Sequence, residues 1–204
     1  MLQTRLRASL GHIGQALREP EAFAWRWHRE GAPYDAWVFA ALALTAIVGT
    51  TTYGLTMGVQ HGLFRMLECG LACTTAAGLS WSLPLPALYI LNSLSGSRLR
   101  ASTTFLAALV TTSWGGLAMI ASIPINWFFS VAIPNETVIL LVNLLIFAGV
   151  GVAMIDIFGR VMATLEPERG RLPVWWLVLV GAIGGELFYW FGLFNFNALN
   201  GLIA

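Results

Sequence analysis

The chain has 204 residues, of which 57% are hydrophobic and 10% are charged, and its formal net charge at pH 7 is +1. Soluble domains carry about 25% charged residues, so this chain has too few to cover a water-facing surface. The small net charge also excludes a nucleic-acid partner, because no global field would attract a polyanion. We expect an all-α, polytopic protein integral to a membrane, with the inner (cytoplasmic) membrane of a bacterium as its location.

Residues 1–34 are predicted to form an arm ahead of a membrane domain at 35–204. Leucines and an isoleucine recur at helical spacing over Leu2–Leu17, with arginines among the other positions. This pattern is typical of a short basic amphipathic helix. Aromatic and arginine side chains then alternate, and both types prefer the headgroup region. We expect the arm to lie at the membrane interface and to contact anionic lipid, through Arg5, Arg7, Arg18, Trp25, Arg26, Trp27 and Arg29. A solvated arm without a partner is the alternative.

Five apolar stretches follow, each long enough for a bilayer core that needs about 20 residues. They cover approximately residues 36–59, 66–94, 102–123, 136–158 and 173–194. Residues 124–134 are aromatic and uncharged, which favours an interfacial linker, and residues 160–171 are expected to form a polar loop. Five spans would place ten of the eleven arginines on one side of the membrane and Arg65 on the other. The positive-inside rule therefore predicts a cytoplasmic N-terminus and a C-terminus outside.

Small residues indicate close helix packing, and prolines indicate helix bending. Pro84 and Pro86 lie within the second stretch, and each removes an amide donor, which predicts a kink. Cys69 and Cys73 stand one helical turn apart in the same stretch, and we interpret them as small packing residues. Glycines at four-residue intervals let two helices approach closely. They occur as Gly54, Gly58 and Gly62 in the first stretch and as Gly181 and Gly185 in the fifth.

Polar residues inside the predicted spans are the candidates for a functional site. Glu186 lies thirteen residues past Pro173, about 20 Å from the cytoplasmic edge at a helical rise of about 1.5 Å per residue. Similar arithmetic predicts a polar layer in the outer third of the membrane, formed by Glu186, Asn143, Thr51, Cys73 and Thr74. It could be a binding or conduction site centred on Glu186. We favour a structural role, in which a protonated Glu186 forms an interhelical hydrogen bond beside Gly181 and Gly185.

Other charged and metal-ligating residues give weaker signals. Asp156 and Arg160 are four residues apart, and Arg65 and Glu68 are three apart, so each pair is expected to neutralise itself locally. His61 is a candidate axial ligand for a pigment or haem, but it would stand without a second histidine on its side of the membrane. No HExxH, GxSxG or Walker motif is present, and no metal-ligand spacing emerges. We therefore expect no enzymatic activity, no metal and no cofactor.

A family resemblance adds to this interpretation. The arm contains the REPEAF segment Arg18–Phe23, five predicted spans follow, and the second ends with PALYILNSLSGSRL, Pro86–Leu99. This organisation resembles the Yip (Ypt-interacting protein) family, most closely in sequence over Leu83–Thr104. The resemblance implies a five-span membrane protein related to ones linked to Rab-type GTPases, membrane curvature and trafficking. It brings no catalytic residues.

The sequence therefore favours a membrane scaffold, organiser or accessory subunit of a membrane complex. Its expected partners are the bilayer and other membrane subunits or further copies of itself. One alternative is a small proton-coupled transporter or permease with a site around Glu186. A second alternative is a pigment- or quinone-associated subunit, suggested by the nine tryptophans and His61.

Overall fold

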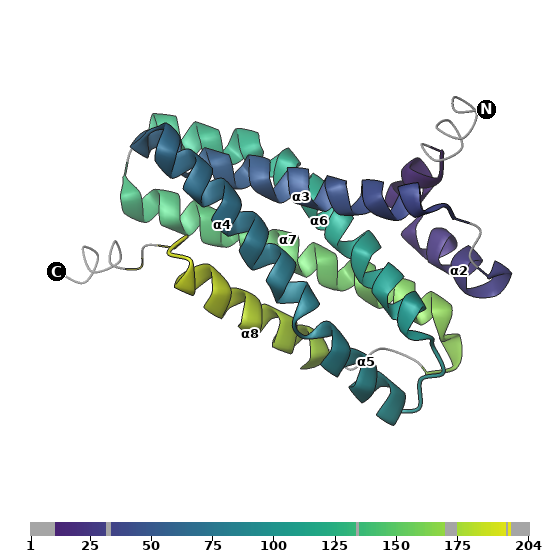
Figure 1. The fold of residues 1–204 in the computed structure, drawn as a ribbon. Coiled ribbons are helices and arrows are strands. Elements are labelled where there is room, and N and C mark those ends of the chain that lie inside the picture. The colour runs from purple at the N-terminus through teal and green to yellow at the C-terminus, as the bar shows by residue number, and fades with distance from the viewer. Residues whose placement is uncertain (1–10, 32–33, 134, 170–174, 195, 197–204) are drawn as a thin grey trace.

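The computed structural model describes residues 11–31, 34–133, 135–169, 175–194 and 196. In these residues all the regular structure is helical (Figure 1), as the sequence predicts. Residues 11–18 form a first short helix. The longer helices are α2 (Pro20–Glu30), α3 (Ala36–Met57), α4 (Leu63–Ser82), α5 (Leu85–Leu94), α6 (Ala101–Ala132), α7 (Glu136–Leu165) and α8 (Trp175–Trp190). Two short 3₁₀ helices, η1 (Val59–His61) and η2 (Pro167–Arg169), lie in turns.

Three of the described helices, α3, α6 and α7, are long and apolar enough to cross a membrane. Helix α8 adds a shorter apolar segment over Val178–Trp190. The exposed side chains on these helices are largely hydrophobic, for example Leu44, Leu145 and Val152. A water-soluble bundle would place polar residues on these outer faces. The fold is thus that of an all-helical protein suited to a membrane.

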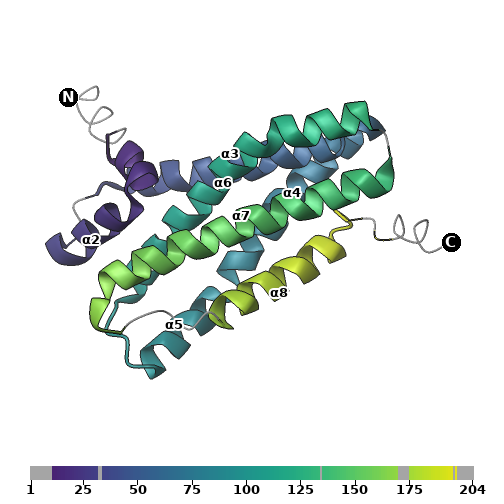
Figure 2. The ribbon, with the colours of Figure 1, turned by 180° about the vertical axis from the view of Figure 1, so that it is seen from behind.

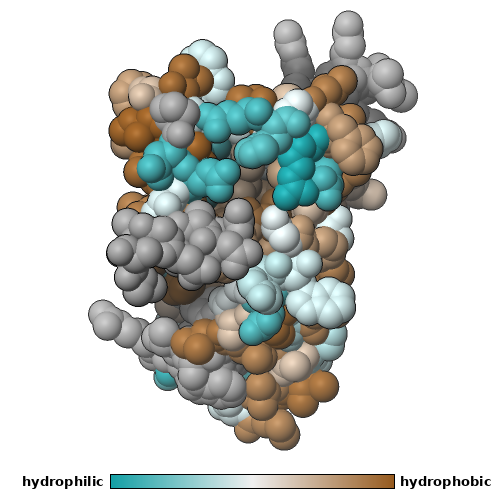
Figure 3. Space-filling view, turned by 90° about the vertical axis from the view of Figure 1, so that its left-hand side faces the viewer, coloured by the Kyte–Doolittle hydropathy of each residue, from teal (hydrophilic) through white to brown (hydrophobic). Residues whose placement is uncertain are grey.

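The long helices form an antiparallel bundle with two distinct ends (Figures 1 and 2). Helices α3 and α6 run away from α2, whereas α4 and α7 return toward it. At the α2 end, Arg160 of α7 pairs with Glu21, and the turn between α5 and α6 is bonded to Glu166. The end near η1 carries Arg65, and there a band of hydrophilic residues crosses a largely hydrophobic surface (Figure 3). Among the described residues, Arg98 and Arg160 thus lie at the α2 end of the bundle and Arg65 at the η1 end.

Glycines allow α3 to pack closely against both α6 and α4. A Cβ added at Gly49 would lie 2.2 Å from the Gly116 carbonyl oxygen of α6. On the α4 side, a Cβ at Gly54 or Gly58 would lie 2.7 Å from the Cys69 oxygen or 2.6 Å from the Arg65 oxygen. Such distances leave no room for a side chain, so these glycines set the helix separations. Gly54 and Gly58 thus lie where the predicted close packing occurs.

The other predicted packing glycines have different surroundings. Gly62 has φ +92° and no atom within 4 Å of an added Cβ, so it forms the turn before α4 rather than a packing contact. Gly181 and Gly185 also have open space at the Cβ position. Helix α8 instead approaches α4 at Gly184, where an added Cβ would lie 3.2 Å from Ser80 Oγ. In the first stretch, the glycine spacing correctly predicted a close helix contact. On α8, the same spacing does not coincide with a close contact within this chain.

Two predicted boundaries were wrong because helices continue through residues that the sequence analysis assigned to loops. Helix α6 passes through Pro124 and ends at Ala132, so residues 124–132 belong to a helix rather than to a linker between helices. Its polar residues Asn126 and Ser130 are buried against the rest of the bundle, which stabilises the extra turns. Helix α7 likewise continues to Leu165, seven residues beyond its predicted end. Within α7, the Asp156 carboxylate and the Arg160 guanidinium neutralise each other.

The second predicted span is interrupted near its prolines. Helix α4 ends at Ser82, and α5 begins at Leu85 with Pro84 at its N-cap position and Pro86 in its first turn. Proline cannot donate to the preceding turn, so the hydrogen-bond ladder is broken at this point. Ser80 and Ser82 hydroxyls donate to the carbonyl oxygens of Ala76 and Gly78. The helix is therefore interrupted where the sequence predicts a kink.

The described part of the arm packs against the bundle. Phe23 and Ala24 of α2 are fully buried, and α2 contacts α6 and α7. The Tyr34 ring stacks on Phe23 at 4.0 Å between centroids, and its hydroxyl donates to the Phe23 carbonyl at 3.0 Å. Trp27 is half-buried in the same cluster. Arg5 and Arg7 lie outside the described residues.

Candidate functional site

Residues of the predicted polar layer form two separate sets of hydrogen bonds around α3. On the α4 side, the Thr51 and Thr74 hydroxyl oxygens lie 2.6 Å apart. Thr50 also donates to Thr74, at 3.4 Å. Threonine hydroxyls in a helix can bond a carbonyl one turn earlier, and Thr51 and Thr74 do so as well. Their polar groups are thus satisfied between two closely packed helices.

The other set begins with Tyr53, whose hydroxyl donates to Asn143 Oδ1 at 2.7 Å. Both side chains are buried, with exposed fractions of 0% and 3%. The Asn143 Nδ2 group donates to the Ile139 carbonyl at 2.9 Å, and Phe147 packs edge-on against the Tyr53 ring. A buried polar pair of this kind connects α3 with α7 and fixes their relative rotation.

Two further polar residues continue this face of the chain toward η1. We name Tyr53, Thr56 and Gln60 the Tyr53 row, because their spacing places them on one side of a helix. Thr56 Oγ1 accepts a 2.9 Å hydrogen bond from Asn126 Nδ2 of α6. The Gln60 amide donates to the Ser130 carbonyl. The row therefore connects α3 and η1 to α6 and α7 by hydrogen bonds between uncharged groups.

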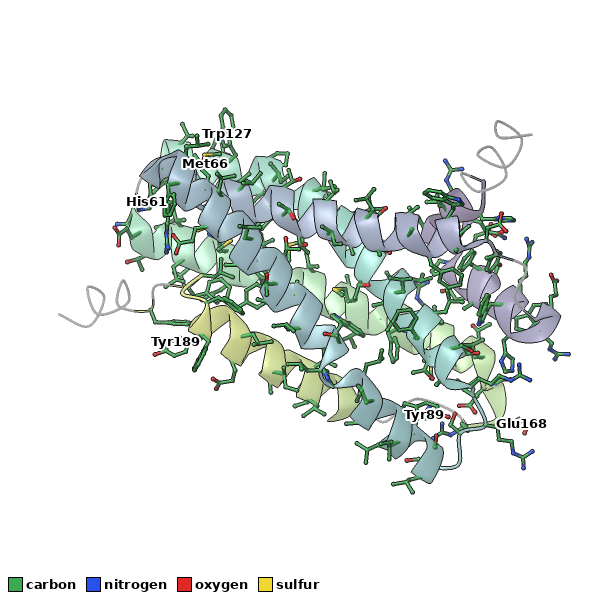
Figure 4. The ribbon with its side chains drawn as sticks, in the orientation of Figure 1. His61, Met66, Tyr89, Trp127, Glu168 and Tyr189 are labelled. Atoms are coloured by element: carbon green, nitrogen blue, oxygen red, sulfur yellow. The ribbon has the colours of Figure 1, made fainter. Side chains whose placement is uncertain are left out.

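The structure does not bring Glu186 into either set. Glu186 is exposed on α8, whereas Asn143 and Cys73 are buried within the bundle. Cys73 packs against Gly54, where an added Cβ would lie 2.7 Å from its own Cβ. Tyr189, three residues after Glu186, also points away from the bundle (Figure 4). A site centred on Glu186 with Asn143 and the threonines as neighbours is therefore absent from the described chain.

A polar cluster around Glu166 lies at the α2 end of the bundle, and the sequence alone did not predict it. Glu166 accepts hydrogen bonds from the Ser97 hydroxyl and the Arg98 backbone N–H, each at 2.9 Å, and from Arg169 at 3.0 Å. Arg169 also donates to Asn92 Oδ1 and, at 3.2 Å, to the Ser95 carbonyl. Ser97 and Glu166 are 69 positions apart. No local spacing rule connects residues so distant in sequence.

The electrostatics of Glu166 follow from these contacts. Burial by itself would raise the pKa of its carboxyl group. The hydrogen bonds from the Arg98 backbone, Arg169 and Ser97 outweigh burial and hold the pKa below its usual range. Glu166 is thus an ionised anchor that ties the end of α7 to the turn before α6.

The described residues contain no group of three or more histidine, cysteine or acidic side chains that could hold a metal ion. Cys69 and Cys73 are free and buried, and His61 is exposed in η1. The predicted local pairs are present, with Arg65–Glu68 at 2.7 Å and Arg160–Asp156 at 3.0 Å. The hydrogen bonds around α3 and Glu166 join helices and turns to one another.

The described chain thus falls in the class of all-helical proteins with helices suited to crossing a membrane. Comparisons with protein-family models, curated proteins and solved structures find no match.

Proposed function

We propose that the protein is a non-enzymatic membrane scaffold, organiser or accessory subunit that assembles with other membrane-embedded helices. The observation that carries this proposal is the exposure of Glu186 on the apolar helix α8. Its side chain makes no hydrogen bond or ion pair within the described chain. On the same helix, Gly181 and Gly185 have open space at their Cβ positions.

A carboxyl group on such a face favours contact with another protein. A charged side chain at the centre of a bilayer costs about 2.5–3.5 kcal/mol or more, so intramembrane acids usually find a hydrogen-bonding partner. Two glycines one turn apart let a second helix approach closely enough to provide that partner. The sequence favours an interhelical hydrogen bond for Glu186. We propose that this bond forms with a helix of another chain rather than within this chain.

The permease alternative has less support. It requires Glu186 to face a polar route, but the buried polar side chains of α3 bond to α4, α6 and α7, and Glu186 faces outward. The Yip resemblance is carried by the segments quoted in the sequence analysis, and it is compatible with a non-enzymatic organiser. For the pigment or quinone alternative, His61 is available, and an absorption spectrum of the purified protein tests it directly.

Purification in a gentle detergent, followed by size measurement and identification of co-purifying chains, tests the proposal. We expect Gly185→Leu to reduce the assembled fraction, because the larger side chain blocks close approach to α8. Gly149→Leu is the matched control, since Gly149 is exposed on α7 with open space at its Cβ position. A monomer that catalyses turnover or liposome flux, with Glu186→Gln abolishing it, would show that the scaffold proposal is wrong.

A further inference from the structure

The turn between α5 and α6, residues 95–100, presents two arginines to the surroundings. Arg98 and Arg100 are exposed, whereas Leu99 between them is 5% exposed and belongs to a buried cluster. The buried leucine anchors the segment and holds its neighbours at the surface. Two residues of extended chain separate Cα atoms by about 6–7 Å, so both guanidinium groups can reach one ligand.

Neither guanidinium group forms an ion pair within the described chain. The Glu166 carboxylate accepts hydrogen bonds from the Arg98 backbone N–H, Arg169 and Ser97, but it makes no ion pair with the Arg98 guanidinium. Glu168 also lies at this end of the molecule (Figure 4), yet it makes no ion pair with either arginine. Five other described arginines have partners, in the pairs Arg26–Gln15, Arg29–Trp25, Arg65–Glu68, Arg160–Glu21 and Arg169–Glu166.

The position of the turn identifies the chemistry that would complement these charges. Arg100 immediately precedes α6, one of the long apolar helices, and the apolar helix α5 ends at Leu94. The turn therefore lies where an apolar helix meets the lipid headgroups. Anionic lipids carry a phosphate at this level, and arginine donates paired hydrogen bonds to phosphate oxygens.

We propose that Arg98 and Arg100 bind the phosphate of an anionic phospholipid. The positive end of the α6 dipole acts in the same direction, because Arg100 provides no side-chain cap for that helix. Glu166 contributes indirectly, since its bonds to Ser97 and the Arg98 backbone hold the turn in place. The inference does not depend on the proposed scaffold function. It also places the lipid contact on a turn of the bundle rather than on the arm.

The test is a lipid titration of the purified full chain in neutral detergent, with bound lipid counted by native mass spectrometry. Phosphatidylglycerol is the anionic probe and phosphatidylcholine the zwitterionic one. A juxtamembrane arginine strengthens binding to an anionic surface by about fivefold, so Arg98→Gln/Arg100→Gln should weaken phosphatidylglycerol binding by at least about tenfold. Phosphatidylcholine binding should be unchanged.

Arg65→Gln/Arg160→Gln is the matched control, because it removes the same charge from arginines that already pair with Glu68 and with Glu21 and Asp156. It should retain phosphatidylglycerol binding, and the thermal unfolding midpoint of the turn variant should remain that of the wild type. Equal binding of the two lipids, or equal loss in the two double variants, would overturn the proposal. Inorganic phosphate is the third probe in the titration. If it binds as tightly as phosphatidylglycerol, the site takes a soluble anion and the lipid assignment is wrong.

Discussion

The Tyr53 hydroxyl donates to Asn143 Oδ1 at 2.7 Å and connects two helices across 90 positions of sequence. Both side chains are buried, so neither group has water as an alternative partner. Removing one member leaves the other with an unmet hydrogen-bonding group in apolar surroundings. This pair therefore joins α7 to α3 by a bond whose geometry depends on the rotation of both helices.

Tyr53→Phe is expected to lower the free energy of unfolding by about 0.5–1.5 kcal/mol, the range for interhelical hydrogen bonds in membrane proteins. Reversible unfolding in mixed detergent micelles measures this change. Asn143→Leu and the double variant complete a cycle that isolates the pairwise energy. Tyr189→Phe is the control, because Tyr189 is 59% exposed. Additive effects of the two core substitutions would contradict the prediction.

Gly49→Ala tests the close contact between α3 and α6. The added Cβ would meet the Gly116 carbonyl at 2.2 Å, and backbone atoms on both sides cannot rotate away. The helices must separate, at a cost of about 1–3 kcal/mol or more. Thermal unfolding should show this loss. The same change at Gly149, which has open space in the middle of α7, should be neutral or stabilising by about 0.5–1 kcal/mol. A neutral Gly49→Ala would mean that the two helices do not meet there.

Glu166→Gln should destabilise the α2 end of the bundle at neutral pH by about 1–3 kcal/mol, because a charged acceptor with several donors is lost. The pKa of Glu166 is lowered in the folded state. Its contribution is therefore present above the unfolded-state pKa, about 4.3, and is lost as pH falls through the lower folded-state pKa. Unfolding measured from pH 7 down to acid should show a shallower decline for the variant. Exposed Glu168, replaced by glutamine, should behave as wild type.

Phe23→Ala tests whether the arm is attached to the bundle. Phe23 is fully buried and stacked on Tyr34, and truncating such a phenylalanine costs about 3–5 kcal/mol. Because α2 is a peripheral element, we expect the loss to appear as local opening. Amide hydrogen exchange should increase in α2 and stay unchanged in α3. Trp25→Ala, at a residue that is 41% exposed, is the control. Uniform acceleration across the molecule would contradict a locally attached arm.

Local patterns predicted the parts of the structure that depend on neighbours in sequence. The Arg65–Glu68 and Asp156–Arg160 pairs have the expected contacts because residues three or four apart share a helix face. The helix is also interrupted next to Pro84, since the effect of proline on the preceding turn is local. Pro124 shows the limit of this reasoning. Buried Asn126 and Ser130 keep α6 helical beyond that proline through contacts with other helices.

Composition and apolar length determined by themselves that the protein is all-helical and carries helices suited to a membrane. Which face of each helix turns inward was decided by tertiary structure. These helices are apolar nearly all round, so their sequences contain no strong signal for rotation. Packing of Gly49 on Gly116 and the bond between Tyr53 and Asn143 orient α3. Because α8 packs on α4 through Gly184, Glu186 faces away from the polar groups that depth arithmetic placed beside it.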